Sequence, residues 1–173
     1  MREREVKVLN IDKEEIEKKL IDLGAVLVKD EDQINYRFDT DDGFLKKTYR
    51  GYLRIRIIKR DSLRVNEEIE TDLSDWESTS KIIELLGYKQ KRPGYKHRRS
   101  YMYENIMFEI DTWDKETYSK PYLEIEVPSD KELEKAIILL NLDRSQITTK
   151  PIDELRKDWV IIIILAKKNW AFR

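Results

Sequence analysis

The chain has 173 residues, a length that suits one domain and leaves little room for a second hydrophobic core. Charged residues make up 40% of it, against about 25% in an average soluble protein, yet 34 basic and 35 acidic residues leave a net charge of -1. This balance excludes a global field that would draw the chain to nucleic acid or to an anionic membrane, so a charged partner must meet a local cluster.

The sequence excludes further kinds of site. It contains no cysteine, which removes disulfides, thiolate metal sites and cysteine nucleophiles, and a reducing cytoplasm fits this best. The N-terminus is charged from Arg2 onward and lacks the apolar stretch of a signal peptide. The longest apolar run, Val160 to Ala166, is far shorter than the roughly 20 residues that cross a bilayer. We therefore expect a cytoplasmic protein with no membrane or nucleic-acid partner.

The N-terminal half of the chain begins with a strand pattern and a helix signal. Arg2–Leu9 follows a period of two, with Val6 and Val8 on the face opposite Glu5 and Lys7, as a half-buried strand does. Asp12 and Glu15 then have the spacing of a capping box, and the apolar positions that follow predict an amphipathic helix. Further segments with a period of two are each predicted to be a strand: Gln33–Thr40, Gly51–Ile58 and Arg64–Leu73.

The C-terminal half opens with a second capping-box spacing at Ser74 and Glu77, followed by apolar residues at 82, 83, 85 and 86. The next period-two segments are predicted strands: Tyr95–Glu104, Ile106–Trp113 and Tyr122–Val127. Ser129 with Glu132 starts another predicted helix, and Pro151 suits the first position of a fourth. The run from Val160 to Leu165 is β-branched and could extend instead. Strands dominate this pattern.

Like charges repeat on one face of most of these strands. Residues two apart in a strand point the same way, so a charge pair with this spacing shares a face. Any single pair could be the wet face of an antiparallel sheet, but repetition concentrates acids and bases on one surface, which is costly unless cations and anions bind between them. The sets are Glu3, Glu5 and Lys7; Arg54 and Arg56; Glu68 and Glu70; Lys96 and Arg98; Glu109 and Asp111; Glu124 and Glu126.

This mixture of charges is typical of phosphoryl or nucleotidyl transfer. Arginine and lysine neutralise phosphate oxygens, while clustered carboxylates hold hard cations such as Mg²⁺ or Mn²⁺. His97 is the single histidine, and alternation points it away from Lys96 and Arg98, which argues against a catalytic base there. Four aromatic residues are assigned to packing: Trp76, Tyr88, Tyr101 and Trp113.

The ordered set of charged strands resembles the CYTH, or triphosphate tunnel metalloenzyme, family. The resemblance runs from residue 1 to about residue 158, within one expected domain of 1–173, and is strongest to class IV adenylate cyclase-like proteins. It implies an α+β fold in which a closed antiparallel β-barrel of about eight strands forms a charged tunnel, with helices packed outside. The motifs that carry it are Glu3-x-Glu5-x-Lys7, Tyr36–Asp41, Leu53-Arg54-Ile55-Arg56, Glu68-Ile69-Glu70, Lys96-x-Arg98, Phe108-Glu109-Ile110-Asp111 and Leu123-Glu124-Ile125-Glu126.

The resemblance also implies a function. Members of the family hydrolyse inorganic, nucleoside or thiamine triphosphates, or cyclise ATP to cyclic AMP and pyrophosphate, with Mg²⁺ or Mn²⁺. By position, the implied catalytic residues are Glu3, Glu5 and Asp111, and the implied triphosphate ligands are Lys7, Arg54, Arg56, Lys96 and Arg98. The implied metal ligands are Glu3, Glu5, Glu68, Glu70, Asp111, Glu124 and Glu126.

Two parts of the chain depart from the family pattern. The family places a strand with a Thr-x-Lys motif after the Arg-x-Arg strand, whereas here the segment 57–64 leaves room only for a hairpin turn. Either the chain is a variant with a weakened phosphate site, which would favour a polyphosphate- or nucleotide-binding module, or residues are missing near Lys59–Ser62. The tail 159–173 resembles nothing in the family, and its apolar run suits packing on the core or in a homodimer.

Overall fold

The computed structural model describes residues 4–43, 53–58, 73–152 and 154–157, with the backbone alone for 53–58. Several predictions fall on other residues. Glu3, the segment 64–72 of the predicted strand Arg64–Leu73 with Glu68 and Glu70, and the tail 159–173 lie outside the described residues.

The described chain forms one antiparallel sheet. Its strands pair in the order β3-β2-β5-β6-β7-β1-β8. In addition, β4 pairs with the C-terminal end of β2, at Phe38 and Asp39. The predicted antiparallel sheet with helices outside is confirmed and is consistent with the tunnel fold; among the described residues, no pairing joins the edge strands β3 and β8. The strands are β1 (Arg4–Val8), β2 (Val26–Asp39), β3 (Leu53–Ile58), β4 (Lys89–Gln90), β5 (Gly94–Tyr103), β6 (Ile106–Trp113), β7 (Tyr122–Val127) and β8 (Ile147–Thr148).

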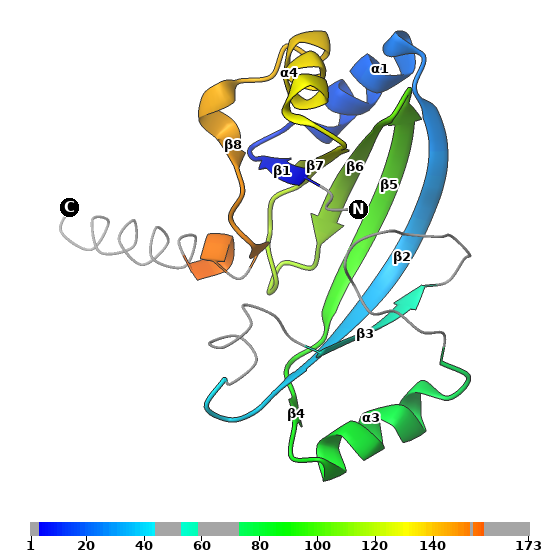
Figure 1. The fold of residues 1–173 in the computed structure, drawn as a ribbon, viewed down its shortest axis with the longest axis vertical. Helices are drawn as coiled ribbons and strands as arrows, with labels where there is room; N and C mark the ends of the chain where they lie inside the picture. The colour runs from blue at the N-terminus through cyan, green and yellow to red at the C-terminus, as the bar shows by residue number, and fades with distance from the viewer. Residues whose placement is uncertain (1–3, 44–52, 59–72, 153, 158–173) are drawn as a thin grey trace, which may run out of the picture.

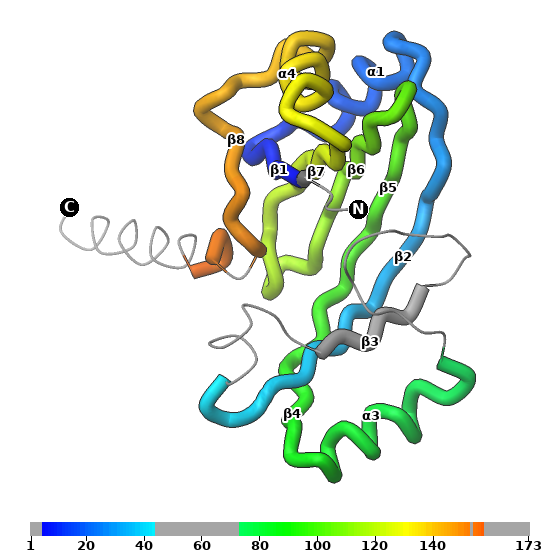
Figure 2. Tube along the Cα trace, viewed as in Figure 1, coloured from blue at the N-terminus to red at the C-terminus, as the bar shows by residue number. Residues whose placement is uncertain are grey.

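The long strands β2 and β5 run side by side along the molecule (Figure 1). The period-two pattern predicted only the second half of β2, from Gln33, because the residues 26–32 do not alternate. Pairing with β5, from Val26 opposite Met102 to Asn35 opposite Gly94, extends the strand there. The trace in Figure 2 also shows β1 beside β7, although more than a hundred residues separate them in the sequence.

The helices α1, α3 and α4 each begin at a residue whose side chain caps them. Asp12 accepts a hydrogen bond from the backbone of Glu15 at the start of α1 (Lys13–Leu23), and Ser129 caps α4 (Asp130–Leu139), both as predicted. The prediction of Ser74 as the cap of α3 (Trp76–Leu85) is wrong, because the Asp75 carboxylate accepts from the Ser78 amide instead. Helical residues also follow Pro151, at 152 and 154–157, and a 3₁₀ turn, η1 (Arg144–Gln146), precedes β8.

The apolar core lies between one face of the sheet and the helices α1 and α4 (Figure 1). Burying a large aliphatic or aromatic side chain contributes about 1.5–3 kcal/mol, which helps to offset the cost of the charges on the other face. Because side chains alternate along a strand, residues between the core positions point to that other face. The central core residues are Val6, Val8, Ile16, Leu20, Phe108, Leu123, Ile125, Ala136 and Leu140.

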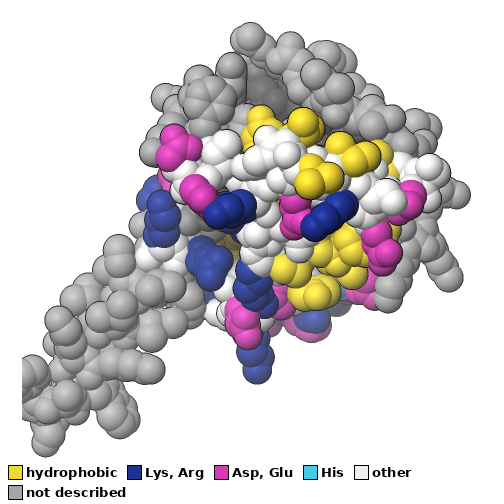
Figure 3. All heavy atoms as spheres, turned by 90° about the horizontal axis from the view of Figure 1, so that it is seen from below, with side chains coloured by type: hydrophobic (Ala, Val, Ile, Leu, Met, Phe, Trp, Pro, Cys, Tyr) yellow, Lys and Arg dark blue, Asp and Glu magenta, His cyan; other side chains and the backbone are white. Residues whose placement is uncertain are grey.

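The helix α3 lies at the opposite end of the molecule from α1 and α4 (Figure 1). Its contact with the sheet includes the stacked rings of Trp76 and Tyr36, with centroids 4.9 Å apart. The apolar stripe predicted for this helix does not form a core, because Ile82, Leu85 and Leu86 are exposed. Figure 3, which views the molecule from this end, shows apolar side chains among charged ones. In the described parts of the chain, no helix is long and apolar enough to cross a membrane.

Candidate active site

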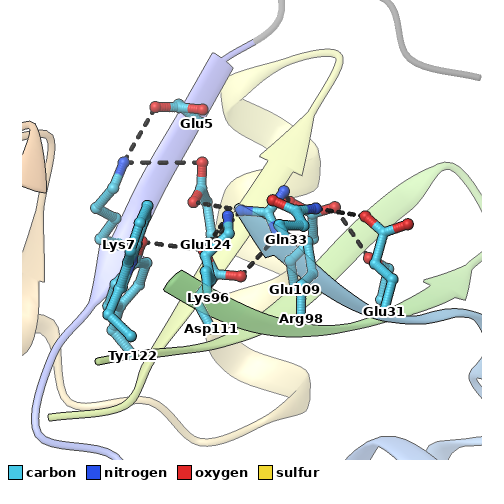
Figure 4. Close-up of polar contacts among 12 residues, drawn as sticks. Glu5, Lys7, Glu31, Gln33, Lys96, Arg98, Glu109, Asp111, Tyr122 and Glu124 are labelled. Atoms are coloured by element: carbon cyan, nitrogen blue, oxygen red, sulfur yellow. Dashed lines mark hydrogen bonds and ion pairs between the residues drawn. The ribbon is translucent and has the colours of Figure 1, made fainter. Parts of the chain in front are cut away.

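A continuous charged face lies on the side of the sheet away from the apolar core (Figure 4). Apart from Glu5 and Glu126, its side chains are buried, and taking a charge out of water costs several kcal/mol unless it is paired. The register brings them together, with Lys7 opposite Glu124 and Arg98 opposite Asp111. The face comprises Glu5 and Lys7 of β1, Glu124 and Glu126 of β7, Glu109 and Asp111 of β6, Lys96 and Arg98 of β5, and Glu31 and Gln33 of β2.

Arg98 lies at the centre of this face and is enclosed by carboxylates. Its Nε donates to Asp111 Oδ1 and its Nη2 to Asp111 Oδ2, each over 2.6 Å, and Nη2 also lies 3.1 Å from Glu124 Oε2. It forms a further ion pair with Glu109. Burial alone would lower the pKa of Arg98, but the charges of Asp111, Glu109 and Glu124 outweigh it and raise that pKa. Arg98 is therefore a fixed positive charge.

Asp111 is held by cations and by a tyrosine. Besides Arg98, Lys96 Nζ donates to its Oδ2 over 3.0 Å, and Tyr122 Oη donates to the same oxygen over 3.0 Å. Burial alone would raise the pKa of Asp111, but Arg98 and Lys96 lower it. Each carboxylate oxygen has about two acceptor positions, so Oδ2, which receives three of these contacts, is saturated, whereas Oδ1 receives one. In this arrangement Asp111 positions Arg98 and Lys96, and its role as a metal ligand stays a prediction.

Two aromatic side chains support this cluster. Trp113 Nε1 donates to Tyr122 Oη over 2.9 Å, and Lys96 Nζ lies 5.2 Å from the centroid of the Trp113 ring. Burial raises the pKa of Tyr122 well above its usual value, so the hydroxyl stays protonated and can donate. Trp113 was predicted only to pack, whereas it also forms a polar contact here.

A group of carboxylates lies at the β1 and β7 end of the face. Oxygens of Glu5, Glu124 and Glu126 all lie within 4.8 Å of one another. Lys7 Nζ lies 3.1 Å from Glu5 Oε1 and 3.8 Å from Glu124 Oε1. Oxygen ligands from several carboxylates are the donor set that Mg²⁺ and Mn²⁺ prefer, so these residues fit a hard divalent cation.

The side chains of this carboxylate group and of Lys7 have pKa values shifted in different directions. Burial raises the pKa of Glu124 to about 7, with Arg98 and Lys7 opposing the shift. Burial also acts to raise the pKa of Glu5, but its hydrogen bond with Glu124 and the charge of Lys7 lower it overall. Burial acts to lower the pKa of Lys7, and the carboxylates of Glu124 and Glu5 raise it overall. The ammonium group of Lys7 therefore stays charged.

The structure thus brings together most of the residues that the sequence singled out. Arg54 and Arg56 are placed only by register, opposite Arg37 and Asn35 of β2. His97 points to the opposite face, where it contacts Asp30 and Asp32, as alternation predicted. The residues that share the site are Glu5, Lys7, Lys96, Arg98, Asp111, Glu124 and Glu126.

The sequence analysis missed further members of the face. Counting by two from Arg98, Asp111 and Glu124 would have reached them, since the alternation is unbroken along β5, β6 and β7. Glu31 lies before the predicted start of its strand. The missed residues are Glu31, Gln33, Ser100 and Tyr122, whereas Glu109 was recognised as part of a charge pair but was given no role.

Comparison with known proteins agrees with this geometry. The family model described as the CYTH domain matches residues 1–153. The chain belongs to the CYTH domain family. This match covers nearly all of the span over which the sequence resembled the family. CYTH proteins act on triphosphates and in general depend on metal ions, and the cluster of Glu5, Glu124 and Glu126 is consistent with that.

Solved structures share the CYTH fold. PH1012 from Pyrococcus horikoshii OT3 is 25% identical, with a TM-score of 0.69 over 88% of this chain and 98% of its own. A candidate adenylate cyclase from Vibrio parahaemolyticus is 14% identical, with a TM-score of 0.72 over 89% and 97%. HpAC1 from Hippeastrum, a candidate adenylyl cyclase with a dominant triphosphatase activity, is 15% identical, with a TM-score of 0.52 over 81% and 87%. The comparison with curated protein sequences found no match.

Proposed function

We propose that this CYTH protein is a metal-dependent enzyme that acts on a triphosphate, either by hydrolysing inorganic, nucleoside or thiamine triphosphate or by cyclising ATP. One observation carries the proposal: the oxygens of Glu5, Glu124 and Glu126 lie within 4.8 Å of one another, beside the buried ammonium group of Lys7. A carboxylate group next to cations matches a metal-bound polyanion.

In this proposal the acidic residues of the charged face bind the metal ion, and the basic residues bind the phosphates. Glu5, Glu124 and Glu126 would hold Mg²⁺ or Mn²⁺, which when bound supplies positive charge and an acidified water. Lys7 and Lys96 would donate hydrogen bonds to phosphate oxygens. Arg98 adds fixed charge behind them and, through Asp111, holds the ammonium group of Lys96 in place. Arg54 and Arg56, on β3, remain predicted ligands of the triphosphate.

Two reactions fit this face. In hydrolysis, a water oxygen attacks the terminal phosphorus and the bridging P–O bond breaks, so the diphosphate part leaves and the attacked phosphorus is released as orthophosphate. In cyclisation, the ribose 3′-hydroxyl attacks the α-phosphorus and pyrophosphate leaves. The structural relatives include candidate adenylate cyclases and a protein with triphosphatase activity, so both reactions are included in the proposal.

A second candidate is a module that binds a triphosphate without turnover. Two observations favour it. The sequence has no Thr-x-Lys strand after Arg56. In addition, Arg98 is already engaged by Asp111, Glu109 and Glu124, so it has less capacity to bind phosphate.

Phosphorus NMR tests the proposal. The purified protein is incubated with tripolyphosphate and, separately, with ATP, in Mg²⁺ and then in Mn²⁺. We expect orthophosphate release or cyclic AMP with pyrophosphate, and loss of either when the metal is chelated. Binding of the triphosphate without any product would favour the second candidate. Neither binding nor turnover would show that the charged face is not a triphosphate site.

A further inference from the structure

Gln33 carries a buried amide, and within the described chain only one end of that amide is hydrogen-bonded. The residue lies on the charged face, opposite Lys96, and is 2% exposed. Its amide nitrogen donates to the carboxylate of Glu31. Its carbonyl oxygen Oε1 is buried and has no hydrogen-bond partner among the residues that the structure describes. A buried acceptor without a donor destabilises the fold, so its position calls for a ligand or a bound water.

The carboxylate of Glu31 fixes which way this amide points. Turning the amide by 180° would bring its carbonyl oxygen against the Glu31 carboxylate, and two acceptors repel each other. Glu31 is itself buried, which strengthens this preference. The acceptor of Gln33 therefore points away from Glu31.

A second unpaired amide lies two residues further along the same face. Asn35 is 4% exposed, and its Nδ2 has no acceptor in the described part of the chain. It lies opposite Gly94, where an added Cβ would approach the Trp113 ring to 2.8 Å. The ammonium group of Lys96 lies 5.2 Å from the same ring. The two amides thus border a corner of the site that contains an aromatic ring and a cation.

Gln33, on β2, and the carboxylate group, on β1 and β7, lie toward opposite ends of the charged face. Figure 4 shows Gln33 beside Arg98 and Glu109, far from Glu5 and Lys7. The strand order explains the separation, because β5, β6 and β7 lie between β2 and β1. A substrate whose phosphates meet the carboxylate-bound metal at one end would extend its other part toward Gln33.

We propose that Gln33 is a specificity-determining residue whose carbonyl accepts a hydrogen bond from an N–H or O–H group on the organic part of the substrate. The inference rests on the proposed function. Ionised tripolyphosphate offers oxygens that accept hydrogen bonds and no donor, so it leaves this acceptor unpaired. The hydroxyls and amines of a nucleoside triphosphate supply the donor. A site built around such a hydrogen bond discriminates against a ligand that lacks it.

Titration calorimetry in Mg²⁺ tests the inference with two probes, a non-hydrolysable ATP analogue and tripolyphosphate. We expect the wild-type protein to bind the analogue more tightly. Gln33→Met, which keeps the side-chain length and removes the acceptor, is expected to weaken binding of the analogue about tenfold, the effect of losing one hydrogen bond. Binding of tripolyphosphate should change less than about twofold.

Two control variants separate this effect from simpler ones. Gln90→Met makes the same change at an exposed position of β4 and should leave both affinities unchanged. Glu31→Met removes the carboxylate that orients the Gln33 amide but keeps the Gln33 carbonyl, so it should weaken binding of the analogue in the same selective way but less than Gln33→Met does. A thermal melt of each variant shows whether it is folded.

The outcomes distinguish the inference from the function on which it rests. Equal affinity of the wild-type protein for both probes, or an equal loss for both in Gln33→Met, would overturn the role of Gln33 and leave the proposed function standing. A water molecule would then be the partner of this acceptor. Failure of the wild-type protein to bind either probe would remove the proposed function and the inference together.

Discussion

Arg98 and Asp111 face each other on neighbouring strands and are joined by two hydrogen bonds of 2.6 Å, one from Nε to Oδ1 and one from Nη2 to Oδ2. The two-pronged geometry matches guanidinium to carboxylate and is stronger than a single contact. Both side chains are almost fully buried, so neither charge can turn to water if the other is lost. The pair is the structural centre of the charged face.

Asp111→Asn should destabilise the fold strongly. The substitution leaves Arg98 and Lys96 buried with one carboxylate fewer, and removing one partner of a buried ion pair costs about 3–5 kcal/mol. Urea denaturation at neutral pH measures the free energy of unfolding. Asp22→Asn is the matched control, because its exposed pair with Lys18 contributes less than about 1 kcal/mol. Similar losses in both variants would show that the buried pair is not central to stability.

Glu5→Gln should abolish metal-dependent activity and leave the fold intact. The Glu5 side chain is 44% exposed, so its neutral isostere removes one oxygen ligand with little effect on packing. We expect a loss of activity of at least about tenfold at fixed Mg²⁺, partly restored at higher concentration. Glu14→Gln, an exposed change on α1, is the control. Full activity of Glu5→Gln at low Mg²⁺ would remove Glu5 from the metal site.

Local alternation explains how much of this site could be predicted. Val6 and Lys7, or Ile125 and Glu124, are adjacent in sequence and point to opposite faces, so a period of two places the charged residues without knowledge of the fold. The same rule correctly predicted that the side chains of His97 and Lys96 point to opposite faces of the sheet. The antiparallel sheet and the strands β6 and β7 were predicted at their observed bounds.

Long-range pairing explains what could not be predicted. Val26–Asp32 is a strand because β5 pairs with it, and nothing in its own spacing shows this. Distances between strands decide whether a carboxylate of the face binds a metal ion or pairs with a lysine or arginine side chain. The sequence therefore could not distinguish the role of Asp111 from that of Glu124. The apolar stripe of α3 is exposed because the periodicity of a helix predicts an apolar face and does not say what covers it.

Glu124 should make the free energy of unfolding fall as pH rises. Its pKa is raised by burial from an ordinary 4.5 to about 7, so its stabilising contribution is complete below pH 4.5 and is lost as the pH rises through 7. Glu124→Gln removes this titration. Between pH 4.5 and 8, the stability of the variant relative to the wild-type protein should therefore increase by about 3 kcal/mol, measured by denaturation with a chelator present. A constant difference across this range would show that Glu124 titrates as an ordinary carboxyl.

Tyr122→Phe should impair substrate binding more than it lowers the stability of the fold. The substitution removes the hydroxyl that donates to Asp111 and accepts from Trp113, and loss of such contacts costs about 1 kcal/mol in stability. Because the same Asp111 oxygen holds Lys96 Nζ, we expect KM for the triphosphate to rise by about fivefold with a smaller change in kcat. Tyr118→Phe removes a nearby hydroxyl outside this chain of hydrogen bonds and should leave KM unchanged. Equal kinetics in the two variants would show that Tyr122 only packs.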